Sequence, residues 1–552
     1  MKNWRINLIL IFIILFGATI VSRLIYIQVL NQEYYKALAQ GQQKILETMQ
    51  GERGEIFFNG GQILATNVES QYLFISPREI EEKTTTVESL SEILNVNKDM
   101  ILEKMEKDNS FEIIKQRLEE EEIAAVKELN LTGVYFGPEI WRSYPQESLA
   151  SQVVGFLGGN TEGQYGIENY YDDILQGKKG LIERAKKGSD IWLTLDYNIQ
   201  FRAEKLLKQA KEDLGIGGGQ IIVLDPNSGK ILALANFPGF DPNKYEEYAK
   251  DQEIFQNGAI QKIFEPGSVF KPITMAAALD QEKITPQTTY VDPGMIKIGG
   301  WPIYNYDQRV YPGETTMTEV LEKSINTGAV FVERELGHNL FLKYIEKFGF
   351  FEPTEIDLQG EIYSENKEFK KGYEINFATV SFGQGIEITP IQLARAFSVI
   401  ANGGKLVKPY LVEKISENGF LSQDSKVIEI QPEISENNII SSRTASQLTA
   451  MLVSVVKNGF AKSAQVPGYY VAGKTGTAQI SFSALEIPGE GYSDKTWQTF
   501  VGFAPAFNPQ FLILIKLDNP KTKTAEYSAV PIFKDLAKHI IDYWQIPPDY
   551  EE

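Results

Sequence analysis

The amino-terminal segment of the chain restricts its fold and location most strongly. Residues 6–22 carry no charged side chain, and an apolar run of this length is near the minimum that a helix needs to cross a bilayer. The apolar character continues over residues 24–30, because the long side chain of Arg23 can extend to the membrane surface. Lys2 and Arg5 precede the run, and a basic flank predicts a cytoplasmic amino terminus. We expect a cytoplasmic tail at residues 1–5 and a transmembrane anchor at residues 6–30.

A cleaved signal peptide is the alternative for this segment. The nearest pair of small residues that suits a cleavage site is Ala37 and Ala39, which lie too far beyond the apolar run to serve. We therefore expect the anchor to remain attached. The rest of the chain would then face the outside, in the periplasm or its equivalent.

Length and composition exclude several classes of function. The chain has 552 residues, which predicts two or three domains. Its formal net charge of −19 argues against a nucleic acid as the main partner, since phosphate binding needs a basic surface. The chain has no cysteine, which excludes disulfides, thiol catalysis and cysteine metal sites.

The histidine content restricts the chemistry further. The only histidines are His338 and His539, too few for a multi-histidine metal site. A Ser-His-Asp triad would need one of them, and the Gly-x-Ser-x-Gly sequence of many such enzymes is absent. His539 lies in an expected amphipathic helix near the carboxyl terminus. If a serine is catalytic in this chain, we expect its base not to be histidine.

The pattern along the chain indicates an α+β protein. Residues 51–67 predict short strands around a turn at residues 59–61, and residues 78–130 have helical periodicity with many charges. The acidic run at residues 119–122 is read as a solvated helix face. After a connector at residues 184–190, the chain predicts a strand, a helix and then a hairpin that turns at residues 227–229. We expect one domain over residues 31–188 and a second over residues 189–552.

The stretch FEPGSVFKP, residues 264–272, places a hydroxyl and an amine on one helical face. Ser268 follows a Pro-Gly pair and precedes a run with helical composition, and Lys271 is three residues further on. This pairs a possible nucleophile with a possible base. The alternative is a helix-capping serine beside an unrelated lysine. The same spacing recurs at Ser364 and at Ser454, so the spacing alone does not decide.

Two further motifs follow in the same half of the chain. Ser324 and Asn326 form a Ser-x-Asn motif near the start of an expected helix over residues 321–337. Lys474, Thr475, Gly476 and Thr477 form a Lys-Thr-Gly-Thr sequence in an expected strand. Glycine lets another backbone approach closely, and such a strand can pair with an extended peptide.

The three motifs in this order resemble the signature of serine enzymes that react with penicillin. The likeness extends over most of the chain, from the anchor to about residue 545. The segments that carry it include WRSYPQESLASQVVGFLG, EGQYGIENYYDDILQGKKG, IIVLDPNSGKILALANFPGFDPN and SFGQGIEITPIQLARAFSVIANGG. They resemble landmarks of the high-molecular-weight class B penicillin-binding proteins, which are monofunctional peptidoglycan D,D-transpeptidases of septal or elongation type. One segment differs from the family pattern: RGEI is followed by FFNGGQILA, where the family usually has Asp-Arg-Asn-Gly.

The resemblance implies a membrane anchor, an elongated mixed β/α pedestal of the dimerisation type over residues 31–188, and a β-lactamase-like transpeptidase domain over residues 189–552. In that domain an antiparallel sheet is flanked by helices. Asn326 favours the septal branch, because elongation-type relatives often carry aspartate there. The residues at 383–385, Gly-Gln-Gly, are read as a tight structural turn near the site.

The resemblance also implies a role for each motif residue. Ser268 would attack a D-Ala-D-Ala stem peptide, and Lys271 would take its proton, which requires a strongly lowered pKa. Ser324 would relay the proton to the leaving D-alanine, and Asn326 would hold the substrate amide. The terminal carboxylate would be bound by Lys474, Thr475 and Thr477. Gly476 lies between Thr475 and Thr477 and is expected to belong to the same substrate-binding segment. The backbone N–H groups of Ser268 and Thr477 would form the oxyanion hole.

Other functions remain open at this point. A D,D-carboxypeptidase or a β-lactamase of the same fold would use water in place of an amine. However, the deacylating Glu-x-x-Leu-Asn of class A β-lactamases is not matched at Leu129-Asn130, where Val126 stands in place of the glutamate. A bifunctional enzyme would need a glycosyltransferase motif before residue 184, and none is recognised. A catalytically silent division scaffold or β-lactam sensor is disfavoured by the three intact motifs.

The expected partners follow from the same resemblance. They are peptidoglycan stem peptides ending in D-Ala-D-Ala, β-lactams, the lipid bilayer, and a membrane glycosyltransferase with other division or elongation proteins. The expected location is the bacterial cytoplasmic membrane. No metal or organic cofactor is implied.

Overall fold

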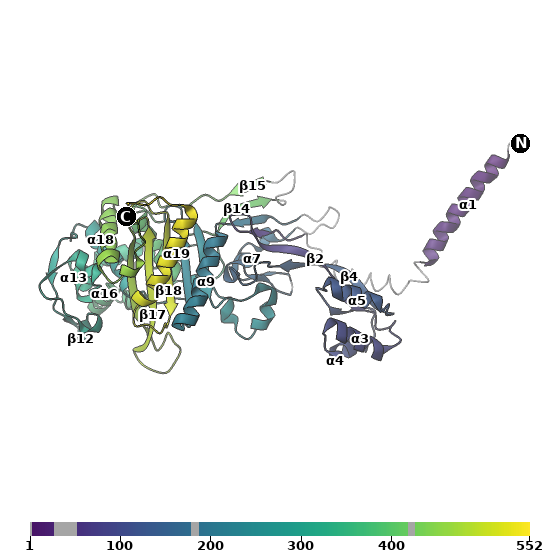
Figure 1. Cartoon of the computed structure of the whole chain (residues 1–552), viewed down its shortest axis with the longest axis horizontal. Coiled ribbons are helices and arrows are strands. Elements are labelled where there is room, and N and C mark those ends of the chain that lie inside the picture. The colour runs from purple at the N-terminus through teal and green to yellow at the C-terminus, as the bar shows by residue number, and fades with distance from the viewer. Residues whose placement is uncertain (1–2, 27–51, 160, 178–186, 418–425, 552) are drawn as a thin grey trace. The chain divides into compact units, whose positions relative to one another are not determined.

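The computed structural model describes residues 3–26, 52–159, 161–177, 187–417 and 426–551. The folded chain divides into two compact units (Figure 1). Unit 1 contains residues 1–53, 66–143 and 176–188, and unit 2 contains residues 54–65, 144–175 and 189–552. Residues 27–30 of the expected anchor and residues 184–186 of the expected connector lie outside the described residues.

The amino-terminal segment forms one long helix, α1 (Asn3–Ile25). Its window Leu8–Ile25 has a mean hydropathy of 2.6 and is not covered by other parts of the protein. Arg23 is the basic residue of its last turn. By length and composition this helix can cross a membrane, as the sequence predicts.

Beyond α1, the described residues of unit 1 form a small sheet with three helices. Strand β2 (Ile63–Ile75) pairs antiparallel with both β3 (Glu112–Lys115) and β4 (Val134–Ser143). Helices α3 (Lys83–Leu94), α4 (Lys98–Met105) and α5 (Glu120–Glu128) share a core with this sheet. The helical reading of residues 78–130 was therefore wrong at residues 112–115. There the β-branched pair Ile113 and Ile114 lies beside β2 and extends the sheet.

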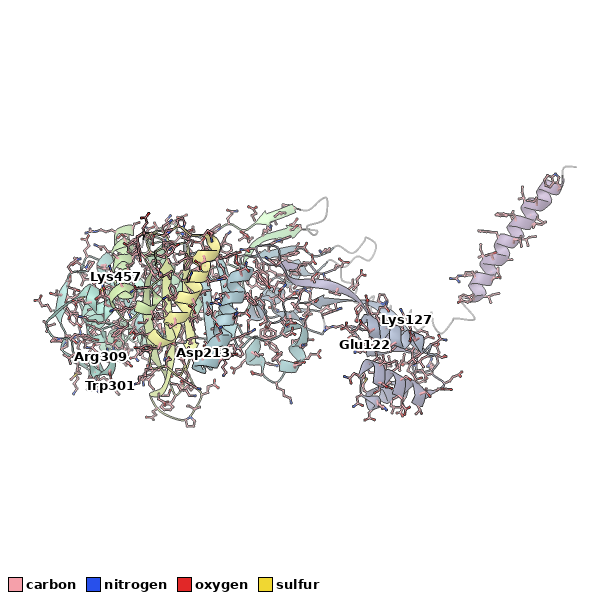
Figure 2. All side chains as sticks on the ribbon, in the orientation of Figure 1. Glu122, Lys127, Asp213, Trp301, Arg309 and Lys457 are labelled. Carbon is pink, nitrogen blue, oxygen red and sulfur yellow. The ribbon has the colours of Figure 1, made fainter. Side chains whose placement is uncertain are left out.

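The acidic run at residues 119–122 has a more specific role than a solvated helix face. Glu122 accepts a hydrogen bond from the backbone N–H of Glu119 at 3.1 Å, which belongs to the capping box of α5. Its carboxylate also pairs with Lys115 Nζ at 2.5 Å. Figure 2 labels Glu122 and Lys127 near the two ends of this helix.

Unit 2 contains a mixed sheet that joins strands from its first part to two strands within residues 412–429. Its strands lie in the order β15 (Lys426–Glu429), β14 (Val412–Glu417), β7 (Asp190–Leu193) and β1 (Ile56–Phe57). The first residues of β2 pair antiparallel with β1, which confirms the expected strands around the turn at residues 59–61. Short helices α6 (Ser151–Val154), α7 (Gly166–Tyr170) and α8 (Asp172–Leu175) and the strand pair β5 (Phe156–Leu157) and β6 (Gly163–Gln164) belong to the same unit.

The larger sheet of unit 2 has five antiparallel strands. Their order is β16 (Ala472–Ser481), β17 (Tyr492–Ala504), β18 (Phe511–Asp518), β8 (Gly218–Leu224) and β9 (Ile231–Phe237). The pair β8 and β9 is the hairpin that the sequence predicts, and Gly229 in its turn has φ +85°. Strand β16, which carries the Lys-Thr-Gly-Thr sequence, lies at one edge of the sheet.

Helices cover this sheet. Helices α9 (Tyr197–Leu214) and α19 (Ala529–Trp544) lie side by side across its strands in Figure 1, and Asp196 caps α9 by accepting from the N–H groups of Asn198 and Ile199. Helices α11 (Lys271–Asp280) and α17 (Pro390–Ala401) are buried along nearly their whole length. The other α-helices among the described residues of this part are α10 (Gly258–Gln261), α12 (Met317–Glu322), α13 (Asn326–Leu336), α14 (His338–Lys347), α15 (Lys367–Lys370), α16 (Glu374–Val380) and α18 (Ser442–Asn458).

A segment rich in strands, residues 281–316, separates α11 from α12, and we call it the excursion. It contains two antiparallel pairs, β10 (Thr289–Val291) with β13 (Glu314–Thr316) and β11 (Met295–Ile298) with β12 (Trp301–Tyr304). Ile298 and Ile303 pack with residues of α13 and α16 in a separate small core. The excursion is thereby attached to the helix that follows Ser324.

Candidate active site

The segment around Ser268 is a tight turn that leads directly into α11. Residues Gly267–Phe270 form a single 3₁₀ turn, and Gly267 has φ +61°, which favours glycine. Ser268 therefore lies just before α11 and not within it. Ser268 Oγ is 3.1 Å from Lys271 Nζ, so the structure brings together the hydroxyl and amine that the spacing predicts.

The amine of Lys271 is enclosed by oxygen atoms. Only 1% of this residue is exposed, and its Nζ is 2.5 Å from Ser324 O, 3.2 Å from Ser324 Oγ and 2.8 Å from Asn326 Oδ1. Burial, together with the charge of Lys474, holds the pKa of Lys271 well below its ordinary value. A neutral amine beside a serine hydroxyl can accept its proton.

Ser324 occupies a strained turn between two helices. The expected helix over residues 321–337 is interrupted here, because α12 ends at Glu322 and α13 begins at Asn326. Ser324 has φ +54°, a left-handed conformation that costs a residue with a side chain about 1–3 kcal/mol. This conformation lies outside the α-helical region, and in this turn both the carbonyl and the hydroxyl of Ser324 contact Lys271.

Lys474 completes the cluster from the edge strand β16. It is fully buried, and its Nζ donates to Ser324 Oγ and to Thr475 O, each at 3.0 Å. Burial lowers the pKa of Lys474 to about 7. One serine hydroxyl is therefore shared by two lysine amines, and Ser268, Lys271, Ser324 and Lys474 form a continuous hydrogen-bonded chain.

The strand β16 packs directly against the turn of Ser268. A Cβ placed on Gly476 would lie 2.7 Å from Pro266 O and 2.9 Å from Val269 Cγ1, so only glycine allows this approach. Thr475 Oγ1 is 3.4 Å from Lys474 Nζ. Thr477 Oγ1 accepts a hydrogen bond from Ala525 N at 3.2 Å.

The Gly-Gln-Gly sequence at residues 383–385 lies beside the same turn. Gly267 N donates to Gly383 O at 2.9 Å, and a Cβ on Gly383 would meet Gly267 O at 2.1 Å. Gly383 and Gly385 both have positive φ. These contacts agree with a tight turn that packs against Gly267, the residue before the serine.

Several residues around the site were not singled out by sequence reasoning. Glu265 accepts hydrogen bonds from Tyr492 OH at 3.0 and 2.9 Å, and burial raises the pKa of Glu265 to about 7. Asp292, Asn305 and Thr327 form a second, buried group beside Asn326. No short motif joins these residues, because they are separated in the sequence and meet only through the excursion before α12.

The cluster can carry out serine chemistry without histidine. Within the described ranges, no group of three or more histidine, cysteine, aspartate or glutamate side chains could hold a metal ion. His338 Nδ1 pairs with Glu333 Oε1 at 2.6 Å, and His539 stacks on Tyr543. The amine of Lys271 lies within hydrogen-bonding distance of Ser268 Oγ and is therefore the candidate base.

Comparison with known proteins identifies both parts of the chain. Residues 219–538 match the penicillin-binding protein transpeptidase domain, and residues 48–193 match the penicillin-binding protein dimerisation domain. Stage V sporulation protein D of Bacillus subtilis is 32% identical, with 94% of this chain and 83% of the relative covered. The probable peptidoglycan D,D-transpeptidase PbpC of Pseudomonas aeruginosa is 31% identical, with 99% and 96% covered.

A solved structure shares the architecture. Penicillin-binding protein 3 of Mycobacterium tuberculosis, in complex with aztreonam, aligns with a TM-score of 0.72 at 27% identity. The alignment covers 91% of this chain and 98% of that one. With two matched domains and relatives of this similarity over nearly its full length, the chain belongs to the class B penicillin-binding proteins.

Proposed function

We propose that this protein is a peptidoglycan D,D-transpeptidase that cross-links stem peptides through an acyl-enzyme on Ser268. The observation that carries the proposal is the hydrogen-bonded chain of Ser268, Lys271, Ser324 and Lys474, in which both lysine amines are buried and have lowered pKa values. The transpeptidase domain and the relatives named peptidoglycan D,D-transpeptidase support the same reaction.

Acylation begins with proton transfer from Ser268 Oγ to the neutral amine of Lys271. Ser268 Oγ then attacks the carbonyl carbon of the penultimate D-alanine, forming a tetrahedral intermediate. Backbone N–H groups of Ser268 and Thr477 stabilise the oxyanion, and a donor of this kind contributes about 3–4 kcal/mol in comparable serine enzymes. The bond to the terminal D-alanine breaks as its nitrogen receives a proton.

Ser324 carries this proton to the leaving nitrogen. Its hydroxyl lies 3.2 Å from Lys271 Nζ and 3.0 Å from Lys474 Nζ, so it can pass a proton to the leaving group and be reprotonated by a lysine. In the second half-reaction the amine of another stem peptide attacks the ester carbonyl. The proton of the attacking amine passes back through Ser324 and Lys271 to Ser268 Oγ. A new amide forms, and Ser268 is released.

The substrate carboxylate is held by Lys474, Thr475 and Thr477, and Gly476 allows their strand to approach the serine. A carboxylate beside Lys474 favours the charged form of this amine. Asn326 holds the substrate amide with its side chain. The free edge of β16 pairs with the extended stem peptide.

The same serine is the site of inhibition by β-lactams. Attack of Ser268 Oγ on the lactam carbonyl opens the ring, so the leaving amine stays attached to the acyl group. The complex of a relative with aztreonam supports this expectation. The acyl-enzyme then persists, because the tethered leaving group remains in the site.

We further propose how the remaining parts contribute. Residues 1–5 stay in the cytoplasm, residues 6–30 form a single-pass anchor, residues 31–188 are a non-catalytic pedestal, and residues 189–552 are the transpeptidase domain outside the membrane. The pair Lys2 and Arg5 before the apolar run supports this orientation. The chain carries no recognised polymerising domain, so a membrane glycosyltransferase would supply the glycan strands together with other division or elongation proteins.

A peptide assay tests the proposed reaction. The protein is incubated with a stem-peptide analogue ending in D-Ala-D-Ala and with a D-amino acid as acceptor, and the products are identified by mass spectrometry. A transpeptidase releases D-alanine and forms the new amide, and Ser268→Ala abolishes both. Release of D-alanine with hydrolysed peptide alone would make the protein a carboxypeptidase. No release by folded wild-type protein would contradict the proposed function.

A further inference from the structure

The helix that presents Asn326 has no cap from its own sequence. The residue at the cap position of α13 is Ile325, whose side chain cannot accept a hydrogen bond. The first backbone N–H groups of the helix are instead satisfied from the excursion. Asn305 Oδ1 accepts from Asn326 N at 3.0 Å and from Thr327 N at 3.1 Å. A residue 21 positions earlier in the chain thus acts as the helix cap.

The side chain of Asn305 is oriented by a buried carboxylate. Its Nδ2 donates to Asp292 Oδ2 at 2.9 Å and to Arg309 O at 3.0 Å. Because both acceptors require the amide nitrogen, the amide oxygen must point at the helix. Asp292 and Asn305 are 5% and 4% exposed, so water does not compete for these bonds.

Asp292 is itself fixed by four donors. Its Oδ1 accepts from Thr327 Oγ1 at 2.6 Å and from Gly294 N at 2.9 Å, and its Oδ2 accepts from Tyr311 N at 2.9 Å in addition to Asn305. Burial alone would raise the pKa of Asp292, but the hydrogen bonds outweigh burial and lower it. The carboxylate is therefore charged, and a negative charge is favourable beside the positive end of a helix.

The excursion also holds the side chain of Asn326. Its Nδ2 donates to Tyr304 O at 2.9 Å, and its Oδ1 lies 2.8 Å from Lys271 Nζ. Neighbouring residues, 304 and 305, thus fix the side chain and the backbone of Asn326 together. Figure 2 labels Trp301 and Arg309, which belong to the same excursion, at the end of unit 2 where β12 and α13 lie.

We propose that Asp292, Asn305 and Thr327 form a positioning network that holds Asn326 against Lys271 and thereby sets the rate of acylation of Ser268. The inference rests on the proposed function of the cluster. Asp292 and Asn305 need not touch the substrate. They act through Asn326, because any rotation or displacement of the first turn of α13 moves the Asn326 amide away from the Lys271 amine.

The test substitution is Asn305→Asp, which keeps the shape of the side chain. The oxygen that replaces Nδ2 carries at most one proton, so it cannot donate to both Asp292 Oδ2 and Arg309 O as the amide nitrogen does. Asn402→Asp is a matched control, since Asn402 also donates through Nδ2 to two oxygens, Pro226 O and Lys405 O, and accepts from two backbone N–H groups. Asn402 lies at the carboxyl-terminal end of α17, and within the described residues none of these hydrogen bonds reaches the catalytic cluster.

The measurement is the rate of acylation by fluorescent penicillin at saturating concentration, with thermal unfolding recorded for each variant. Misplacing a catalytic group by about 1 Å costs up to about a hundredfold, so we expect Asn305→Asp to lower the limiting rate by about tenfold or more. Asn402→Asp should keep the wild-type acylation rate even if its unfolding midpoint falls. Equal rates for Asn305→Asp and wild type, or equal slowing by both variants, would overturn the proposal.

A milder pair of substitutions covers the case in which Asn305→Asp fails to fold. Thr327→Val removes the hydroxyl that donates to Asp292 but keeps the side-chain volume, whereas Thr327→Ser keeps the hydroxyl. We expect slower acylation with valine and recovery with serine, and a wild-type rate with valine would refute the network. If the wild-type protein is not acylated at all, the proposed function fails and not the network alone.

Discussion

The contact between the edge strand and the serine turn leads to a quantitative prediction. A Cβ at position 476 would lie 2.7 Å from Pro266 O, whereas ordinary contact begins at 3.4 Å. In Gly476→Ala the strand β16 and the turn must therefore separate by about 0.7 Å at this point. The Pro266 carbonyl is backbone, and the backbone nitrogen of Val269 lies at 3.2 Å as well, so side-chain rotation cannot relieve the overlap.

The expected loss follows from this displacement. The backbone N–H of Thr477, which we propose as the second oxyanion donor, and the amine of Lys474 would both move with β16 relative to Ser268. Misplacement of this size costs about tenfold to a hundredfold in rate. Overpacking of a buried contact also destabilises a fold by about 1–3 kcal/mol. The assay is the second-order rate of acylation by fluorescent penicillin, with the unfolding midpoint measured beside it.

Gly217→Ala is the control for this prediction. Gly217 precedes strand β8 of the same sheet, and a Cβ there would have Asp518 O at 3.7 Å as its nearest neighbour. We expect this variant to acylate at the wild-type rate. If folded Gly476→Ala protein also acylated at the wild-type rate, the close packing of β16 on the serine turn would not matter for catalysis.

Three further predictions test other parts of the account. Removing the charge of Lys474 with Lys474→Met should raise the pKa of Lys271. The acidic limb of the profile of acylation rate against pH should then move to higher pH. A limb that stays in place or moves to lower pH would contradict the electrostatic effect of Lys474 on Lys271. Ser441→Ala removes the cap of α18, where Ser441 Oγ accepts from Thr444 N at 3.1 Å, and should cost about 1 kcal/mol, seen as a lower unfolding midpoint with unchanged acylation. Deleting residues 1–30 should release the protein from the membrane fraction while penicillin labelling is retained, and a protein that remains membrane-bound would show that another segment anchors it.

The elements that the sequence predicted correctly depend on local patterns. The apolar run at the amino terminus, the hairpin of β8 and β9, and the strand of Lys474 each carry their periodicity or turn residues in a few consecutive positions. The spacing of Ser268 and Lys271 is also a local pattern, because residues three apart lie close together in a helical turn. The order of the three motifs indicates the class B penicillin-binding proteins, the family to which the chain belongs.

What sequence reasoning missed depends on contacts between distant residues or on unusual backbone geometry. The strand β3 forms within a highly charged region because β2 offers a partner, which helical periodicity does not reveal. The left-handed conformation of Ser324 breaks an otherwise helical pattern. Asp292 and Asn305 are 13 positions apart, and only the pairing of the excursion's strands brings them to the start of α13.

The most direct test of the account is the identity of the acylated residue. Membranes that contain the wild-type chain or Ser268→Ala are treated with fluorescent penicillin and separated by gel electrophoresis. We predict a labelled band near 62.2 kDa for the wild-type chain and no labelled band for Ser268→Ala at equal protein level. A Ser268→Ala band as strong as that of the wild type, or a folded and membrane-bound wild-type chain that never becomes labelled, would contradict the assignment of Ser268 as the nucleophile.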